Sequence, residues 1–326
     1  MGVTLQAEPL GKKLQVELQR IIEAMMEVTM PEIPEMEIYK DYLSKLVKGK
    51  LITDANVLRV KSVNLESTDF CRSVIGKLIR DISRRGKYII FQLDDGHFLL
   101  THMMLDGRLF LLPSDFRING QSNKELSFEI VHSEAEDLRR KIKELPGKPS
   151  VIFELSGDSV LFFCSLTLGY LYYLRQDELE TKLGKLGRDP LDPNFDAQVF
   201  SRLLEGKKGM IKPWLMNPKN IAGVGNAYSN EALFGAGILP NRSISMMSKI
   251  DRVNLYDSLV NILRDSIRLG GDMEEPFAPG DDFTGGYNPY FKVYDRSGKL
   301  CPVCQNVIEQ SEVGGRNAFF CSQCQR

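Results

Sequence analysis

Residues 301–324, CPVCQNVIEQSEVGGRNAFFCSQC, contain the spacing that decides the fold of the C-terminal part of this chain. Two Cys-x-x-Cys pairs are separated by sixteen residues, and they are Cys301 with Cys304 and Cys321 with Cys324. Each pair can present two thiolates to one ion, and two pairs complete a tetrahedral zinc site with no open position for a substrate. The spacing therefore predicts one structural zinc ion that folds a short β-hairpin. The alternative, a redox dithiol pair, needs a thioredoxin-like context that is missing here.

Length and net charge limit which binding partners the chain can have. The chain has 326 residues and a formal net charge of -1, so it is large enough for two or three domains and is not strongly basic. Any affinity for nucleic acid must therefore be local. Residues 72–87 contain six basic residues against one acid, and residues 207–242 contain five against one. Each cluster is equally well explained as a solvated face.

The N-terminal half predicts a helix followed by a β-sandwich. A proline-rich start at Pro31 with acidic residues in the first turn leads into apolar positions at helical spacing, and Gly49 ends the helix. Short apolar segments bounded by Gly, Asp or Pro then indicate strands. These segments are residues 78–83, 88–93, 98–103, 108–112, 151–155 and 160–174. The apolar run 159–174 is too short to span a bilayer, so we expect buried strand there.

The second half changes pattern after Arg175. The predicted divisions are an extension at 1–30, the sandwich domain at 31–176, a linker at 177–195, a helical domain at 196–290 and the zinc finger at 291–326. Residues 270–289 predict a long loop. Residues 9–27 have the spacing of an amphipathic helix, and the charged residues 133–148 predict a helical or loop insertion between strands.

A glycine motif lies in the helical domain. Residues 212–228 read KPWLMNPKNIAGVGNAY, with Gly223 and Gly225 between two helical stretches. At such glycines a ligand can approach the backbone closely, so the N–H groups that begin the next helix are predicted to hold a phosphate, and Asn226 adds a side-chain donor. Glycines also simply turn a chain, and the motif alone leaves that alternative open.

Four motifs in order resemble the formamidopyrimidine-DNA glycosylase and endonuclease VIII family. They are residues 31–35 (PEIPE), 85–88 (RGKY), 212–228, and the cysteine module with residues 315–321 (GRNAFFC). The resemblance spans residues 31–326. It implies an α+β fold with an N-terminal helix and β-sandwich, a helix-two-turn-helix domain and a zinc-finger hairpin, with DNA between the lobes. It also implies a monomeric, cytoplasmic DNA repair glycosylase and abasic-site lyase that acts on double-stranded DNA with a damaged base or abasic site.

The resemblance implies roles for single residues. Pro31 matches the N-terminal proline nucleophile, and Glu32 matches the adjacent acid that manages protons during base loss. Lys87 matches the strand lysine that contacts DNA near the lesion and donates a proton in strand cleavage. Asn226 matches the phosphate-binding residue, and Arg316 the finger arginine at the lesion phosphate, which we also count as catalytic. The predicted DNA-binding set is Lys87, Lys212, Gly223, Gly225, Asn226 and Arg316.

A proline nucleophile accounts for two linked activities. A secondary amine that adds to C1′ of the sugar expels the base and leaves an iminium, whose acidified C2′ proton can be removed to break the 3′ phosphate bond. The amine must be unprotonated to attack, and its position at a helix start disfavours the positive charge. The target nucleotide must first leave the base stack.

Pro31 lies inside the chain as written, where its nitrogen is a tertiary amide and cannot attack. Residues 26–30 (MEVTM) can be encoded by a sequence that contains a bacterial ribosome-binding site just before Met30. We therefore expect residues 1–29 to be upstream sequence and Met30 to be removed before the small Pro31. The alternative is a non-catalytic damaged-DNA-binding protein whose extension blocks Pro31. A zinc-ribbon scaffold for RNA or protein would leave the motifs at Pro31 and Lys212 unexplained.

Three stretches depart from the family pattern. Residues 164–169 (CSLTLG) replace the Asp-Pro-Arg-Arg-Phe-Gly of members that remove oxidised purines, so either Leu166 or Leu168 is an apolar wedge or the stretch is plain strand core. Leu105 stands where the family has a void-filling Met. The loop 270–294 has about the family's length but an acidic, unlike sequence, so the family's contacts to 8-oxoguanine cannot be carried over to it. A member specialised for oxidised pyrimidines, abasic sites or crosslinks is therefore an open alternative.

Overall fold

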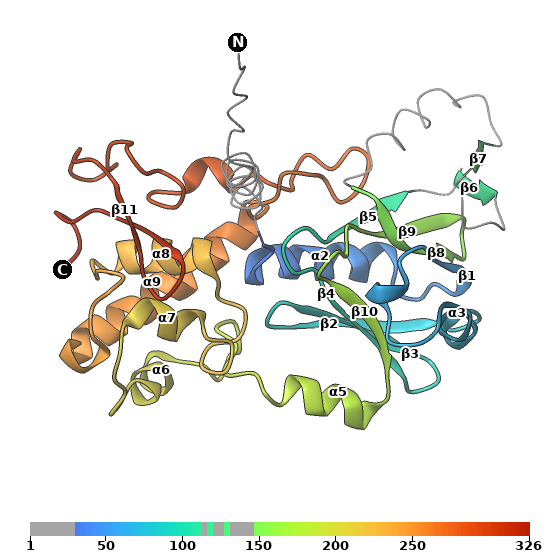
Figure 1. The fold of residues 1–326 in the computed structure, drawn as a ribbon, viewed down its shortest axis with the longest axis horizontal. Coiled ribbons are helices and arrows are strands. Elements are labelled where there is room, and N and C mark those ends of the chain that lie inside the picture. The colour runs from blue at the N-terminus through green and yellow to red at the C-terminus, as the bar shows by residue number, and fades with distance from the viewer. Residues whose placement is uncertain (1–29, 113–115, 120–126, 131–146) are drawn as a thin grey trace, which may run out of the picture.

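The structure is a computed structural model that describes residues 30–112, 116–119, 127–130 and 147–326. The predicted helix at 9–27 and nearly all of the predicted insertion at 133–148 lie outside these residues. The described chain forms two lobes side by side, a β-sandwich and a helical lobe that also includes the C-terminal hairpin (Figure 1). None of the described helices is long and apolar enough to cross a membrane.

The sandwich lobe consists of two four-stranded antiparallel sheets, in the orders β1-β8-β9-β5 and β10-β4-β3-β2. Its strands are β1 (Ile52–Val57), β2 (Ile79–Arg85), β3 (Tyr88–Leu93), β4 (Phe98–His102), β5 (Arg108–Leu112), β8 (Pro149–Leu155), β9 (Ser159–Cys164) and β10 (Tyr170–Leu174). A small hairpin, β6 (Phe116–Asn119) and β7 (Ser127–Ile130), pairs separately. Its helices are α2 (Ile33–Leu46), α3 (Ser67–Val74) and the 3-10 turn Val60–Ser62.

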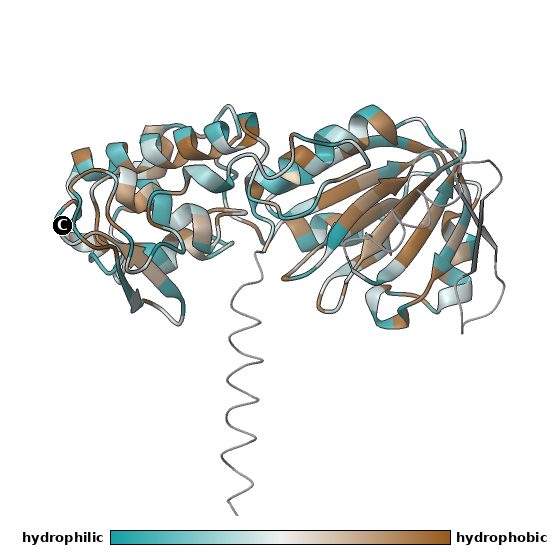
Figure 2. Cartoon of the chain, turned by 90° about the horizontal axis from the view of Figure 1, so that it is seen from above, coloured by the Kyte–Doolittle hydropathy of each residue, from teal (hydrophilic) through white to brown (hydrophobic). Residues whose placement is uncertain are grey.

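The sandwich core explains why the apolar segments become strands. Phe91 of one sheet and Phe163 of the other are buried, with ring centroids 6.1 Å apart. Phe153 meets Phe163 edge-on at 5.4 Å. Figure 2 shows apolar residues concentrated along these strands. Fully buried aromatic side chains of this kind supply much of a domain's hydrophobic stabilisation.

One strand prediction was wrong. The apolar run 159–174 is not one strand, because the backbone turns at Ser165, whose φ is 50°, and the chain then crosses to the other sheet. β9 therefore belongs to the first sheet and β10 to the second. Hydrophobicity continues through the crossing because both strands face the same core, which is why composition alone did not reveal the break. β1 and α3 were not predicted.

The helical lobe contains four helices in its described residues, α6 (Ala197–Leu203), α7 (Ile211–Met216), α8 (Asn226–Gly235) and α9 (Lys249–Arg268), with 3-10 turns at Ile244–Met246 and Asn288–Tyr290. Helix α5 (Gln176–Leu183) precedes them and packs on the sandwich. The hairpin β11 (Glu309–Glu312) and β12 (Asn317–Phe320) ends the chain. The predicted linker at 177–195 begins inside helix α5, because Glu178 caps the Arg175 backbone and Leu179 packs against the sandwich.

Candidate active site

Four elements from both lobes meet around one cavity of about 570 Å³. They are the start of α2, the turn between β2 and β3, the start of α8 and the turn of the C-terminal hairpin. Helix α2 makes this possible, since it packs on β2 and β3 of the sandwich and on α9 of the helical lobe. Six of the predicted site residues line the cavity: Glu32, Lys87, Gly223, Gly225, Asn226 and Arg316.

The carboxylate of Glu32 occupies the start of helix α8. Glu32 is 3% exposed and accepts hydrogen bonds from the backbone amides of Gly225 and Ala227, the latter at 2.9 Å. A side chain at Gly225 would overlap both the Glu32 carboxylate and the Lys87 ammonium group. The backbone donors that were predicted to hold a phosphate are therefore used to hold this acid. The glycine is needed for close approach, as expected, but the group that approaches is protein.

Glycine is required at position 223 for a second reason. Gly223 has a φ of +91°, and a side chain there would overlap Ile33 and press against the backbone of Gly86. The β2–β3 turn thus lies directly on the α7–α8 connection. This contact fixes Lys87 of one lobe beside Gly225 of the other.

Burial sets the proton affinity of Glu32. Removal from water raises the pKa of its carboxyl to about 7; Lys87 lowers it, and the nearby Glu35 raises it. A carboxyl with this pKa can both accept and give up a proton near neutral pH. Glu32 therefore has the property that acid–base chemistry in the cavity requires.

Glu35 is a site residue that the sequence analysis missed. It was interpreted only as a first-turn helix acid, but it is 1% exposed and burial raises the pKa of its carboxyl. Its oxygens accept bonds from the Glu32 amide at 2.8 Å, the Tyr228 hydroxyl at 2.5 Å and the Asp272 amide at 2.8 Å. Asp272 also lines the cavity, and burial together with Glu35 and Glu32 raises its pKa to about 7. The spacing of Glu32 and Glu35 in PEIPE was the available signal.

Met30 stands between the cavity and the predicted nucleophile. Its side chain lines the cavity, and Lys87 Nζ lies 3.5 Å from its sulfur. Pro31 is buried behind it and precedes the first residue of α2. With Met30 attached, the Pro31 nitrogen is an amide. Removal of Met30 would turn that nitrogen into a secondary amine and would take away the side chain that contacts Lys87.

Lys212 does not have the surroundings predicted for a DNA contact. Its side chain is completely buried, and its ammonium group donates to Asn226 Oδ1 at 2.7 Å, Asn230 Oδ1 at 3.0 Å and the Asn317 carbonyl at 2.5 Å. These three bonds use all its donors. Burial lowers the pKa of Lys212 to about 7. Lys212 instead orients Asn226, because it holds the side-chain oxygen and leaves the amide NH2 for an acceptor in the cavity that Asn226 lines.

The four cysteines form the predicted zinc site. Their sulfurs all lie within 4.8 Å of one another, with Cys301 and Cys324 at 3.8 Å and Cys304 and Cys321 at 3.4 Å. Tetrahedral zinc with bonds of about 2.3 Å needs sulfurs about 3.8 Å apart, so the arrangement fits one structural ion.

The finger hairpin carries Arg316 to the cavity. Arg316 is exposed in the turn between β11 and β12, which contains the positive-φ residues Gly314 and Gly315. The hairpin is fastened to α8 because the Phe319 amide donates to Asn230 Oδ1 at 3.0 Å. Asn230 also accepts a hydrogen bond from Lys212. Asn230 of helix α8 therefore links the zinc-binding hairpin to the buried Lys212.

The structure separates the two candidate wedge residues. Leu166 is completely buried in the sandwich core, so of the alternatives left open for this stretch it fits the core interpretation and not the wedge. Leu168 is 57% exposed and remains a candidate. Leu105, predicted as the void filler, lines the cavity together with Met104.

Comparisons with known proteins agree along the whole described chain. Three family models match: the formamidopyrimidine-DNA glycosylase N-terminal domain at residues 30–165, its H2TH domain at 186–277, and the zinc finger found in FPG and IleRS at 298–326. A formamidopyrimidine-DNA glycosylase of Pelotomaculum thermopropionicum is 30% identical over 91% of this chain and 99% of its own. Another, from Wolbachia pipientis, is 31% identical over 91% and 100%.

Solved structures give the same result. The complex of Lactococcus lactis Fpg with DNA that contains an abasic site has a TM-score of 0.76 and 25% identity, and covers 91% of this chain and 100% of that one. A mutant of the same protein bound to Fapy-dG DNA gives a TM-score of 0.75 with the same identity and coverage.

A sandwich and a helical lobe that share one acid- and lysine-lined cavity, with a cysteine finger at its mouth, define a zinc-finger DNA glycosylase. The chain belongs to the formamidopyrimidine-DNA glycosylase family.

Proposed function

We propose that this DNA repair glycosylase excises a damaged base through a Schiff base on Pro31 and then cleaves the strand as an abasic-site lyase. The observation that supports it best is the position of Pro31 in the chain between Met30 and Glu32, both of which line the cavity that Lys87 also lines. The proposal requires that the chain before Pro31 is removed. The family match from residue 30 onward supports that requirement.

The residues supply each step of this reaction. The Pro31 nitrogen adds to C1′ of the flipped nucleotide, the bond to the base breaks, and Glu32 passes the proton lost by nitrogen to the departing base. Protonation of O4′ opens the sugar and leaves the iminium. Glu32, ionised after it has protonated the base, then takes the C2′ proton, and the C3′–O bond to the 3′ phosphate breaks while Lys87 donates a proton to the leaving phosphate oxygen. Whether a second elimination follows depends on the base that removes the next proton.

Asn226 and Arg316 are the proposed phosphate ligands on either side of the flipped nucleotide. Asn226 offers the amide that Lys212 orients, and Arg316 offers a charge-assisted donor from the zinc hairpin. The zinc ion is structural and holds the hairpin. We also propose a cytoplasmic location, because four zinc-binding thiolates persist where thiols stay reduced.

Borohydride trapping on a duplex with one abasic site tests the proposal. Two forms of the protein with the same Pro31 are compared, one that begins at Pro31, checked by mass, and the full chain of 326 residues. The form that begins at Pro31 is expected to give a covalent complex, and the full chain none. Tight binding without a complex in either form would identify a non-catalytic damaged-DNA-binding protein.

A further inference from the structure

A second cavity, of about 480 Å³, adjoins the active site. Four cationic side chains line it, and we call it the cationic cavity: Arg85, Arg188, Lys207 and Lys219, around the half-buried ring of Trp214. No carboxylate is among its lining residues. The catalytic mechanism proposed above uses none of these side chains.

The charges of this cavity are largely uncompensated. Arg188, Lys207 and Lys219 are exposed, and within the described part of the chain their side chains have no ion pair. Arg85 lies 3.7 Å from a carboxylate oxygen of Asp189. That oxygen already accepts from Arg84 at 2.8 Å, so it offsets only part of the charge on Arg85.

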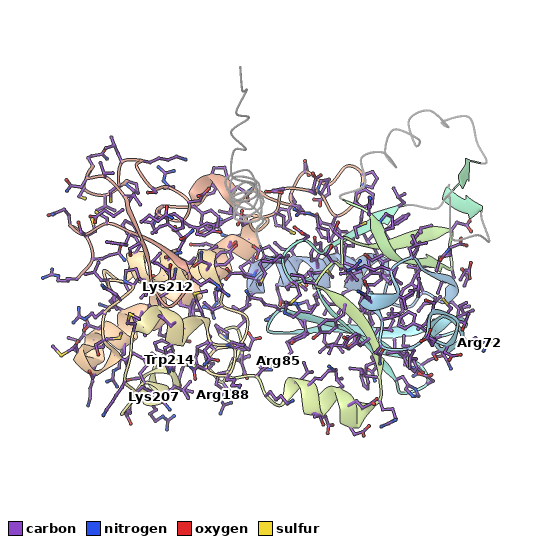
Figure 3. All side chains as sticks on the ribbon, in the orientation of Figure 1. Arg72, Arg85, Arg188, Lys207, Lys212 and Trp214 are labelled. Atoms are coloured by element: carbon purple, nitrogen blue, oxygen red, sulfur yellow. The ribbon has the colours of Figure 1, made fainter. Side chains whose placement is uncertain are left out.

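The cavity joins the two basic clusters found in the sequence. Arg85 comes from residues 72–87, and Lys207 and Lys219 come from residues 207–242. Figure 3 shows Lys207 and Trp214 in the lower part of the helical lobe, with Arg188 and Arg85 toward the junction of the lobes, while Arg72 lies at the far end of the sandwich. Solvated faces have no reason to converge on one hollow from separate lobes, so the convergence favours a ligand.

The position of the cavity indicates which ligand. Leu186 lines both this cavity and the active site. Lys87 faces the active site and Arg85, two residues earlier in the same turn, faces the cationic cavity. Likewise Pro218 lines the active site and Lys219 the cationic cavity. A strand that leaves the active site past these two segments enters the cationic cavity next.

We propose that the cationic cavity is a second phosphate-binding subsite, which holds the sugar–phosphate backbone of the substrate duplex beyond the lesion. The inference rests on the proposed function, because DNA must first occupy the active site. Duplex DNA carries one charge per about 1.7 Å, so its backbone can satisfy several cations in one hollow. The apolar face of Trp214 lowers the local dielectric and strengthens those contacts.

The salt dependence of DNA binding tests the subsite. The double variant Arg188→Ala/Lys207→Ala is compared with the wild type on a long duplex with a central abasic-site analogue. Each lost phosphate contact lowers the slope of log K against log salt by about 0.9, so the double variant is expected to lose about 1.8. Arg72→Ala is the matched control, because Arg72 is exposed, pairs only with Asp69 and lies far from both cavities. Its slope is expected to equal that of the wild type.

Neutral methylphosphonate linkages, placed singly along each strand, locate the contact. The proposal expects a flanking position outside the lesion where the neutral linkage weakens the wild type severalfold and has no further effect in the double variant. An unchanged slope, or additive losses at every position, would overturn the proposal and leave an acidic protein or a free anion as the occupant. Borohydride trapping by the wild-type protein reports on Pro31 separately, so a failure there identifies the proposed function as wrong and not the subsite.

Discussion

The active-site cavity combines buried acids with the cations Lys87 and Arg316, whereas the cationic cavity next to it is lined by cations alone. Glu32, Glu35 and Asp272 enter the first, and their pKa values are raised because burial removes them from water. The second is lined by four cations and no acid. The comparison indicates a division of roles: the acids that can transfer protons lie in the active-site cavity, and the cations that can attract the DNA backbone without a neighbouring acid lie in the cationic cavity.

This separation explains how a chain with a net charge of -1 serves a nucleic-acid partner. Acids next to the lesion would repel phosphate if they were ionised and exposed. Glu32 is instead bonded to two backbone amides, and Glu35 to two amides and a hydroxyl. Each acid is thus compensated locally, while the neighbouring cations stay open to solvent.

Among the variants of the active-site cavity, Glu32→Gln is expected to reduce the rate of base release the most. The amide retains the size of the side chain but cannot pass a proton, so single-turnover base release is expected to fall about 10²- to 10⁴-fold. Glu312→Gln is the control, since Glu312 lines the same cavity from an exposed strand and should change the rate less than threefold. Near-wild-type base release by Glu32→Gln would show that another group moves the proton.

Removal of zinc tests the hairpin that connects the cavity to DNA. A strong chelator should unfold the hairpin and remove Arg316 from the cavity mouth, so affinity for abasic-site DNA is expected to fall about tenfold to a hundredfold. Metal release and binding are measured on the same sample. Cys71→Ser, which changes a thiol outside the cluster, should retain one zinc ion per chain. Unchanged affinity after zinc loss would exclude Arg316 as a phosphate ligand.

Lys212→Met sharpens the contrast between a buried cation and the exposed cations of the second cavity. Loss of the ammonium group removes the donor from Asn226 Oδ1 and from the Asn317 carbonyl, both partly buried, and one of the two donors from the buried Asn230 Oδ1, which is expected to cost about 2–3 kcal/mol of unfolding free energy. Urea unfolding measures this. Lys208→Met, at an exposed position, should stay within about 0.5 kcal/mol of the wild type. Equal stability of the two variants would contradict a structural role for Lys212.

Asp272→Asn is expected to have the smallest effect, and one that depends on pH. The pKa of Asp272 is raised to about 7 in the folded protein, against about 4 when unfolded. Its stabilising contribution is therefore full below pH 4 and is lost as the pH rises through 7. The Asn variant should be as stable as the wild type at pH 4 and more stable at pH 8 by about 1 kcal/mol, well below the roughly 4 kcal/mol that the full shift would give, because Asp272 is partly exposed to solvent. Thermal unfolding at both pH values measures this, and Asp282→Asn in the same loop should show no such trend.

The sequence predicted the elements that local patterns specify. The zinc hairpin, α2 and the strands β3 and β5 follow from cysteine spacing, proline position and apolar runs with clear ends. The break at Ser165 was missed because the apolar run continues across it. The burial of Lys212 and Glu35 could not be predicted, since it depends on contacts between residues up to 237 positions apart. Their charges suggested surface positions, and only the packing of α8 on α2 and the finger removes them from solvent.

The identity of the atom that bonds to the sugar tests the central claim most directly. After borohydride trapping of the form that begins at Pro31, trypsin releases residues 31–40 (PEIPEMEIYK) as the N-terminal peptide. The account predicts that the reduced sugar remnant is found on this peptide, and that fragmentation assigns it to the Pro31 nitrogen. A remnant on Lys87 or another lysine would contradict the account, because the nucleophile would then be a side-chain amine.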